Sequence, residues 1–396
     1  MNTYLLIINA GSSSIKFALY RHEQGNDLEA DVSGQMESIG IVPRFTVTDV
    51  NGRRIVDQNC AVEQVQNHQS ALAHIQNWLD RYLTSGQLIA VGHRVVHGGQ
   101  NYIAPVLINE QVLADLEYLN SLAPLHQPHN VSAIRLILQS RPDLPQIACF
   151  DTAFHNTQPE VAKRLALPRQ YSAEGLIRYG FHGLSYEYIA SMLPTLNAKL
   201  PNARVIVAHL GNGASLCALN HSRSIATTMG FSPLDGLVMG TRCGAIDPGV
   251  LLYLLEQHAM DVPRLTQLLY HQSGLLGVSG LSSDMRVLLE SDSAAAQEAI
   301  ELFVYRIARE IGSLVAALGG LDALIFTGGI GENAAQIREL ISDKMAWLGL
   351  AFDATANQQN AACISLPEST VSAWIIPTNE NLIIARHTLQ VVNTKP

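Results

Sequence analysis

INAGSSSIKF, residues 8–17, closes one apolar run, turns through glycine and serine, and enters a second apolar run. AHLGNGASLC, residues 208–217, repeats this pattern 200 positions later, so that Gly11 corresponds to Gly211. Glycine and small polar side chains allow a turn to present backbone N–H groups to an anion. The two stretches therefore predict two lobes of related design that bind an anionic ligand, and phosphate is the favoured one.

The size of the chain favours two domains. Of its 396 residues, 47% are hydrophobic, and single cores stop growing at roughly 250 to 300 residues. The net charge of −9 and the lack of any Lys/Arg run argue against a nucleic-acid surface. Five scattered cysteines without a CxxC pair predict reduced thiols in the cytoplasm. With no basic leader and no apolar run of about 20 residues, we expect neither export nor a membrane partner.

Short apolar runs alternate with helical patterns along the chain, which predicts an α/β fold. The expected strands are 4–8, 88–91, 146–150, 204–208, 323–326 and 371–376. The expected helices are 110–120, 131–139, 185–192, 249–257, 294–318, 332–348 and 380–390. Ligands of such sheets lie beyond the carboxyl ends of the strands, and the polar residues follow those ends.

Three glycine turns follow expected strands, at 11–14, 211–213 and 328–331. Neither the P-loop motif nor the dinucleotide-binding GxGxxG fingerprint is present, which disfavours a P-loop enzyme and a nicotinamide-dependent dehydrogenase. Any one of these turns alone is more often ordinary turn chemistry. Three together favour phosphate binding, the third at the start of a helix.

Each charged candidate also has a purely structural interpretation. Lys16 fits a solvated residue on an alternating strand, and Arg94 and Arg242 fit structural salt bridges. Asp151 fits a cap after a strand, and His182 fits a hydrogen-bonded core residue. No HExxH motif or Cys/His cluster indicates zinc.

Taken together, the motifs resemble those of the acetate kinase family, within the sugar-kinase and actin-like ATPase superfamily. They occur in order along nearly the whole chain: NAGSSSIKF, GHRVVHGG, LAPLH, FDTAFH, YGFHG, VAHLGNGAS, MGFSPLDGLVMGTR, SGLLGVSGLSSDMR, FTGGIGEN and IPTNEN. The resemblance implies two duplicated ribonuclease-H-like domains with a cleft between them. We expect an acyl and phosphate-side domain at 1–151, to which a helix at 381–396 returns, and a nucleotide-binding domain at 152–380.

The resemblance also implies a role for individual residues. The expected catalytic residues are Asp151, His182 and Arg242. The expected substrate-binding residues are Arg94, Val96, Leu125, Phe181 and Pro233. The expected ATP-binding residues are Ser12, Ser14, Lys16, His209, Leu210, Gly211, Asn212, Gly213, Asp284, Met285, Arg286, Gly329, Ile330, Gly331, Glu332 and Asn333. Asn9 and Glu380 are expected to hold Mg²⁺, with Mn²⁺ as an alternative.

Three positions depart from the family pattern. Gln127 stands where the family has asparagine, and Cys243 and Ala245 follow Arg242 in place of a serine and an aspartate. The loss of that hydroxyl and carboxylate can change how the arginine is oriented, but it removes none of the expected site residues.

The implied reaction is acetate + ATP ⇌ acetyl phosphate + ADP in a cytoplasmic homodimer. Acetate is already ionised near neutral pH, so Asp151 is expected to position groups rather than remove a proton. The repulsion between two anions is the main barrier, and we expect Lys16, Arg94, His182, Arg242 and the metal to offset it. Val96 favours acetate over longer acids, with a propionate or short-chain acyl kinase as the alternative. An actin-like ATPase without an acyl acceptor is a second alternative.

Overall fold

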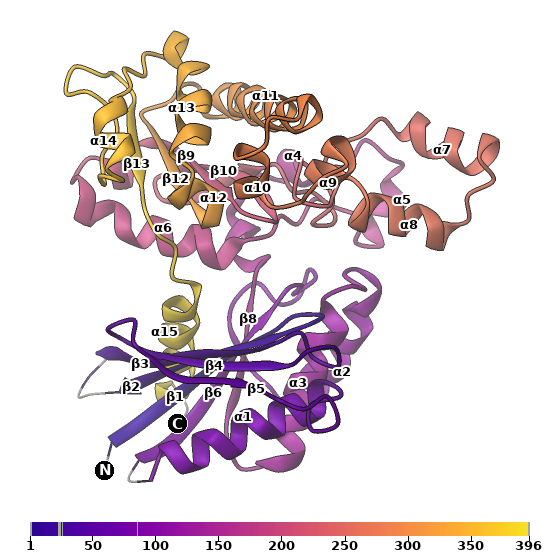
Figure 1. Cartoon of the computed structure of the whole chain (residues 1–396), viewed down its shortest axis with the longest axis vertical. Coiled ribbons are helices and arrows are strands. Elements are labelled where there is room, and N and C mark those ends of the chain that lie inside the picture. Colours follow the sequence, from indigo (N-terminus) through magenta and orange to yellow (C-terminus); the bar gives the residue numbers. More distant parts are fainter. Residues whose placement is uncertain (1, 23–24, 26, 85, 395–396) are drawn as a thin grey trace. The chain divides into compact units, whose positions relative to one another are not determined.

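The computed structural model describes residues 2–22, 25, 27–84 and 86–394. It divides into two compact units: unit 1 consists of Met1–Ala153 and Asn379–Pro396, and unit 2 consists of Phe154–Thr378 (Figure 1). Lys395 and Pro396, the end of the helix expected at 381–396, lie outside the described residues.

Unit 1 is built on an eight-stranded sheet in the order β5-β4-β3-β2-β1-β6-β8-β7. β1 to β5 are antiparallel neighbours, whereas β6 runs parallel to β1 and β8 runs parallel to β6. The strands are β1 (Asn2–Ala10), β2 (Ile15–His22), β3 (Leu28–Glu37), β4 (Arg44–Asp49), β5 (Arg54–Asn59), β6 (Gly86–Val95), β7 (Val106–Leu107) and β8 (Gln146–Phe150). The helices are α1 (His68–Tyr82), α2 (Glu110–Tyr118), α3 (Gln127–Ser140) and α15 (Glu380–Asn393).

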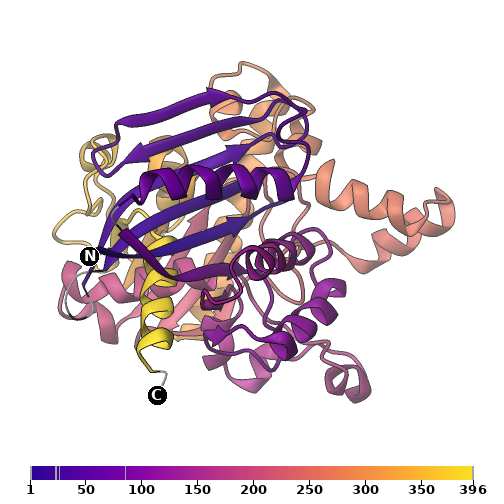
Figure 2. The ribbon, with the colours of Figure 1, turned by 90° about the horizontal axis from the view of Figure 1, so that it is seen from below.

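β1 is covered on both faces. Leu6 and Ile8 belong to a core shared with α1 and α3, and Figure 2 shows α1 lying over the strands. A side chain at Gly92 of β6 would collide with Thr388 and Ile384 of α15 and would also meet Ile7. Glycine at this position therefore lets α15 lie directly on the sheet, which brings Glu380 to the strands that carry Asn9 and Arg94.

Unit 2 contains a five-stranded sheet in the order β11-β10-β9-β12-β13. The strands are β9 (Arg204–Leu210), β10 (Ala214–Asn220), β11 (Arg223–Thr227), β12 (Ala323–Thr327) and β13 (Ser372–Ile375). The helices are α4 (Glu160–Lys163), α5 (Arg169–Ala173), α6 (Gly183–Leu196), α7 (Pro248–Gln257), α8 (Val262–His271), α9 (Gly274–Ser279), α10 (Met285–Leu289), α11 (Ala294–Leu318), α12 (Gly328–Asn333), α13 (Ala335–Asp343) and α14 (Ala354–Gln358). α6 packs on this sheet through Ile189 and Leu193, and α11 packs against β9, β10 and β11.

The two sheets share one topology. In unit 2 the first strand pairs antiparallel with the second and parallel with the fourth, and β3-β2-β1-β6-β8 repeats this arrangement in unit 1. The glycine turns at 11–14 and 211–213 join the first two strands of each sheet. The duplicated α/β fold expected from the sequence is confirmed.

One expected helix is wrong in its extent. Residues 332–348 do not form one helix, because α12 ends at Asn333 and α13 begins at Ala335. Ala334 between them has φ −97° and ψ 83°, which is not helical. The GGIGEN stretch is itself the short helix α12, rather than a loop that precedes a helix.

Candidate active site

A pocket of about 600 Å³ lies in unit 2 between the glycine turn after β9, α10 and α12. Its volume is in the range of small-molecule and cofactor sites. It is lined by Gly211, Asn212, Ser283, Asp284, Met285, Arg286, Leu289, Gly329, Ile330, Asn333 and Ala334. A Cβ at Gly211 would lie 3.9 Å from the Gly329 amide nitrogen, so two of the expected phosphate turns meet at this pocket.

The pocket brings together eight of the thirteen ATP-binding residues expected in unit 2, whereas the expected Ser12, Ser14 and Lys16 belong to unit 1. Ser283, Leu289 and Ala334 line it and were not anticipated: Ser283 lies within the SGLLGVSGLSSDMR motif but was given no role, and Leu289 and Ala334 lie outside the motifs. His209, Leu210, Gly213, Gly331 and Glu332 were expected there but do not line it. Leu210 and Gly331 are buried.

Glu332 ties the start of α12 to the chain before α15. Its Oε1 accepts hydrogen bonds from the Gly328 amide at 2.8 Å, the Thr378 amide at 3.1 Å and the Thr327 hydroxyl at 3.3 Å. These three bonds occupy the carboxylate oxygen, which explains why it faces the backbone rather than the pocket. Glu332 thus fixes the position of α12.

Arg338 of α13 holds the end of α12 in place through buried hydrogen bonds. It is fully buried, and burial lowers the pKa of its guanidinium. Its Nη1 donates to the carbonyl oxygens of Gly331 at 3.0 Å and Glu332 at 2.9 Å. Its Nε and Nη2 donate to oxygens of Asn357 and Asn360. Arg338 therefore satisfies carbonyl groups that the end of a short helix leaves without helical partners.

Asp284 begins α10 at the edge of the pocket. Its Oδ1 accepts from the Arg286 amide at 2.9 Å, and its Oδ2 lies 2.6 Å from Arg286 Nη2. Hydrogen bonds from Arg286 lower the pKa of Asp284. The Arg286 side chain is 87% exposed, so its guanidinium lies in solvent at the pocket rim.

His182 and Arg242 converge on Gly213. A Cβ at Gly213 would lie 3.4 Å from His182 Nε2 and 3.6 Å from Arg242 Nη2. The Arg242 Nη1 donates to the Pro233 carbonyl at 2.8 Å, which fixes the guanidinium. Because glycine has no side chain, the two nitrogen groups share an open position beside the glycine turn that reaches the pocket.

The backbone of His182 is strained. His182 precedes α6 with φ 58°, a left-handed conformation that is uncommon for residues other than glycine. Its ring stacks on His209 with centroids 4.3 Å apart, and its Nδ1 lies 2.8 Å from the Ser215 hydroxyl. Strain held in place by several contacts is common at functional sites. Phe181, expected in the acyl pocket, is buried directly before it.

In unit 1, Arg94 at the end of β6 forms a two-pronged ion pair with Asp151 after β8. Nε donates to Oδ1 at 3.0 Å and Nη2 donates to Oδ2 at 2.6 Å. Glu380 Oε2 lies 3.8 Å from Arg94 Nε. Burial alone would lower the pKa of Arg94, but the charges of Asp151 and Glu380 outweigh burial and raise it. Nη1 takes no part in the pair with Asp151, which leaves it available to a ligand.

Two buried amides hold this part of unit 1 together. Asn130 of α3 donates to the Ala10 carbonyl at 2.7 Å and accepts from the Val96 amide at 3.0 Å. Gln127 accepts from the His97 amide at 3.1 Å and donates to its carbonyl at 3.0 Å. Asn130 therefore fixes the glycine turn after β1 relative to the end of β6. Gln127, a departure from the family pattern, has a structural partner.

The turn after β1 presents small polar residues to solvent. The Gly11 amide donates to the Ser14 carbonyl at 2.8 Å, and Lys16 pairs in register with Asn9. Ser12 and Lys16 are exposed, and Ser14 is half-buried. Val96 is buried and Leu125 is half-buried, so the two acyl-pocket residues expected from unit 1 are not both enclosed within it.

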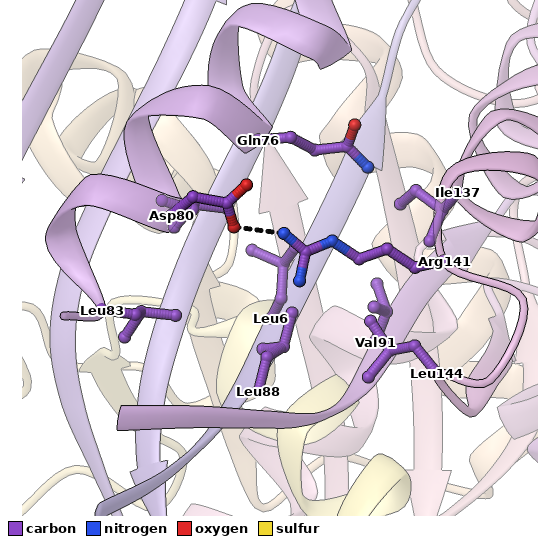
Figure 3. A pocket seen from close by; sticks show the side chains of 10 residues that line it. Leu6, Gln76, Asp80, Leu83, Leu88, Val91, Ile137, Arg141 and Leu144 are labelled. Carbon is purple, nitrogen blue, oxygen red and sulfur yellow. Dashed lines mark hydrogen bonds and ion pairs between the residues drawn. The ribbon is translucent and has the colours of Figure 1, made fainter. Parts of the chain in front are cut away.

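A second cavity in unit 1 is too small for a substrate. It holds about 10 Å³, roughly one water molecule. Figure 3 shows its largely apolar lining and the Asp80–Arg141 ion pair among the side chains that line it. The cavity is therefore a packing defect between α1, α3 and the sheet.

Asn9 and Glu380 supply oxygen donors, which suit Mg²⁺. Among the described residues, no group of three or more His, Cys, Asp and Glu side chains is placed to hold a metal ion. Mg²⁺ is typically bound by one or two protein oxygens together with substrate phosphates, so this donor set fits it. All five cysteines are free thiols. Within the described ranges, every helix is too short or too polar to cross a bilayer.

Comparison with known proteins identifies the family. The model of the Acetokinase family matches residues 4–386. An acetate kinase of Rhodopseudomonas palustris is 55% identical over 391 residues, 98% of each chain. The crystal structure of a propionate kinase from Francisella tularensis has a TM-score of 0.91 at 37% identity, covering 98% of this chain and all of that one. The structure of Porphyromonas gingivalis acetate kinase has a TM-score of 0.86 at 35% identity, covering 98% and 99%. The resemblance drawn from the ordered motifs is thereby confirmed, and the chain belongs to the acetokinase family.

Proposed function

We propose that this protein is an acetate kinase, which transfers the γ-phosphoryl group of ATP to acetate and forms acetyl phosphate and ADP. The observation that carries the proposal is the convergence of His182 Nε2 and Arg242 Nη2 on Gly213, next to a pocket of nucleotide size. Two donors facing one open position suit a phosphoryl group that gains negative charge on its oxygens.

In the proposed reaction a carboxylate oxygen of acetate attacks the γ-phosphorus, and the bond from phosphorus to the departing ADP oxygen breaks. No proton needs to leave acetate. Arg242 and His182 donate to the equatorial oxygens, where the arginine fork is fixed by the Pro233 carbonyl. At 4 Å, opposite unit charges attract by roughly 4 kcal/mol at an effective dielectric of 20, against about 1 kcal/mol in water.

We propose that Arg94 binds the acetate carboxylate and that Asp151 positions Arg94. The two-pronged pair supports this division, because Asp151 engages Nε and Nη2 and leaves Nη1 for substrate. A carboxylate held between two guanidinium donors is a poor base. Lys16 and the serines after Gly11 are proposed to contact phosphate, which their exposure allows.

Unit 1 is proposed as the acyl and phosphate-side domain and unit 2 as the nucleotide-binding domain. Glu380, with Asn9 directly or through water, would hold Mg²⁺, which supplies positive charge to the phosphates. The half-buried Glu380 carboxylate is positioned by α15, whose first turn it occupies. Arg94 near Glu380 keeps that carboxylate paired when no cation is bound.

Propionate is a second candidate substrate, since one structural neighbour is named a propionate kinase. Val96 is buried, and we expect its branched side chain to narrow the acyl pocket. A single methylene changes binding by only about 1 to 3 kcal/mol, so propionate is expected to react more slowly but measurably. Values of kcat/KM for acetate, propionate and butyrate test this order, and a preference for butyrate would contradict it.

We also propose a cytoplasmic homodimer. α7 and α8 project from the rest of unit 2 (Figure 1), and α7 has no buried residue although it is largely apolar. Leu252, Tyr253 and Val262 are 59%, 57% and 69% exposed. Apolar surface of this kind marks interaction sites, and a second copy of the chain is the proposed occupant. The free thiols and the use of ATP fit a cytoplasmic location.

A further inference from the structure

A chain of hydroxyl groups runs from the core of unit 2 to His182. Tyr186 of α6 is fully buried, and its hydroxyl lies 2.5 Å from the Ser215 hydroxyl of β10. Ser215 is fully buried too, and its hydroxyl lies 2.8 Å from His182 Nδ1. Burial raises the pKa of Tyr186 well above 10, so the phenol keeps its proton.

The direction of the hydrogen bonds follows from counting protons. Within the described part of the chain, the Tyr186 hydroxyl has one hydrogen-bond partner, Ser215 Oγ, so it donates there. Ser215 has the partners Tyr186 and His182, and its own proton therefore goes to His182 Nδ1. An Nδ1 that accepts a hydrogen bond carries no proton, so a neutral His182 carries its proton on Nε2.

We propose that Tyr186 and Ser215 are positioning residues that hold His182 as the neutral Nε2–H tautomer, with that N–H aimed at the position beside Gly213. This inference rests on the proposed phosphoryl transfer. The opposite tautomer would present a lone pair to phosphoryl oxygens, which repel it. This relay, the hydrogen-bonded chain Tyr186–Ser215–His182, thus lets a neutral His182 act as a donor, without requiring an imidazolium.

Other titratable groups in unit 2 face this network. His209 of β9 stacks on the His182 ring, and Arg242 approaches the same open position. Cys217 of β10 and His155 lie near Tyr186, the latter with ring centroids 5.6 Å apart. Burial raises the pKa of Cys217 to about 12 and lowers that of His155 to about 4. Both groups are therefore neutral around pH 7, and Arg242 remains the fixed charge.

The direct test is nitrogen NMR of the protein labelled with ¹⁵N-histidine, with the His182 signals assigned by their loss in His182→Asn. At pH 7.5 we expect the shifts of protonated Nε2 and unprotonated Nδ1. In Tyr186→Phe, the Ser215 hydroxyl no longer receives a proton from Tyr186 and becomes free to accept one from Nδ1. A measurable population of the Nδ1–H tautomer is therefore expected in that variant.

The second readout is the ratio of variant to parent kcat across pH. Protonation of His182 places a proton on Nε2 whatever the tautomer, so low pH is expected to rescue the variants. For Ser215→Ala and Tyr186→Phe, we expect kcat about tenfold below the parent at pH 8 and within about threefold at pH 6. Tyr188→Phe, on the same helix but outside the hydroxyl chain, is the matched control and is expected to show no change at either pH.

A loss of kcat that is independent of pH in folded variants, or an Nδ1–H tautomer in the parent, would overturn the relay. Circular dichroism establishes folding, and Tyr186→Phe keeps the test decisive should Ser215→Ala fail to fold. The NMR measurement identifies the His182 tautomer whether or not the enzyme is active. Absence of acetate kinase activity with an Nε2–H tautomer would therefore refute the function while sparing the geometry.

Discussion

At Gly213 the missing side chain creates the open position on which His182 and Arg242 converge. A methyl group there would lie 3.4 Å from His182 Nε2 and 3.6 Å from Arg242 Nη2, where a phosphoryl oxygen is proposed to bind. The backbone has no positive φ at this residue, so alanine fits the main chain. The loss of activity in an alanine variant would therefore report the steric effect of the methyl group, without a contribution from backbone strain.

Gly213→Ala is expected to lower kcat at least about a hundredfold while unfolding at nearly the parent's urea midpoint, because displacing reacting groups by about 1 Å costs that much. Gly312→Ala in α11 is the matched control. A Cβ at Gly312 meets nothing within 4 Å, so this variant should keep full activity and gain up to about 1 kcal/mol. Near-normal turnover of Gly213→Ala would show that the phosphoryl group does not bind at this position.

His93 links stability to pH. It is buried with Nε2 2.7 Å from Gln146 Oε1, and burial lowers its pKa from 6.5 to about 4. As the pH falls below 6.5, His93 becomes protonated in the unfolded chain but stays neutral in the folded protein. Stability is therefore present in full above pH 6.5 and declines toward pH 4, by on the order of 3 kcal/mol for this residue.

His93→Gln removes this titration and keeps a donor for Gln146. The difference in unfolding free energy between parent and variant is expected to shift by about 2 to 3 kcal/mol in the variant's favour between pH 7 and pH 4.5. Urea denaturation at both pH values measures it. A difference that stays constant would mean that His93 is not the buried neutral group described.

At the scale of elements, α12 depends on groups that lie outside it. Glu332 anchors its start, and Arg338 donates hydrogen bonds to its last carbonyl groups, so one wall of the pocket is fixed from two sides. Every hydrogen bond of Arg338 goes to a neutral oxygen. A lysine keeps the charge but cannot reach all of these oxygens in one plane.

Arg338→Lys is expected to lower the free energy of unfolding by about 2 to 3 kcal/mol and to raise the KM for ATP severalfold, with little change in the KM for acetate. Arg309→Lys on the exposed face of α11 is the control and should alter neither quantity. Equal rises in both KM values would show that Arg338 acts on the fold as a whole instead of on α12.

The elements differ in how far the sequence predicts them. The two strand–glycine turn–strand units follow from apolar runs broken by small residues. β5 carries almost no apolar alternation, because five of its six residues are exposed, so no pattern marks it. Ser215 is a single hydroxyl in an apolar strand, and only the folded structure, in which its hydroxyl lies 2.8 Å from His182 Nδ1, reveals its partner. Arg338 likewise looks like an ordinary polar position of an amphipathic helix.

At the scale of the molecule, we propose that each of the two units carries a different part of the active site. Unit 1 holds the Arg94–Asp151 pair and the oxygen donors, whereas unit 2 holds the pocket with His182 and Arg242. This division stays a prediction from the motifs. Asp151 and the glycine turns follow the ends of strands, whereas His182 and Arg242 lie in loops, between α5 and α6 and between β11 and α7. The details of the site, such as the pairing of Arg94 with Asp151, depend on strand neighbours that the sequence leaves open.

The exposed apolar helix α7 gives the expected homodimer a surface that can be tested. Leu252→Glu combined with Tyr253→Glu is expected to convert a dimer into a monomer, because charges would have to be buried at the interface. Light scattering after size exclusion measures the mass. Trp347→Glu, another exposed apolar position, is the control, and an unchanged dimer in the double variant would place the interface elsewhere.

The proposed reaction is the phosphorylation of a carboxylate. The most direct measurement is the acetate-dependent formation of acetyl phosphate from ATP and Mg²⁺, trapped with hydroxylamine as the hydroxamate. We expect hydroxamate to form in step with ADP, to saturate in both acetate and ATP, and to be abolished in Arg242→Ala. ADP release that continues at the same rate without acetate and yields no hydroxamate would contradict the proposed reaction and would indicate an ATPase.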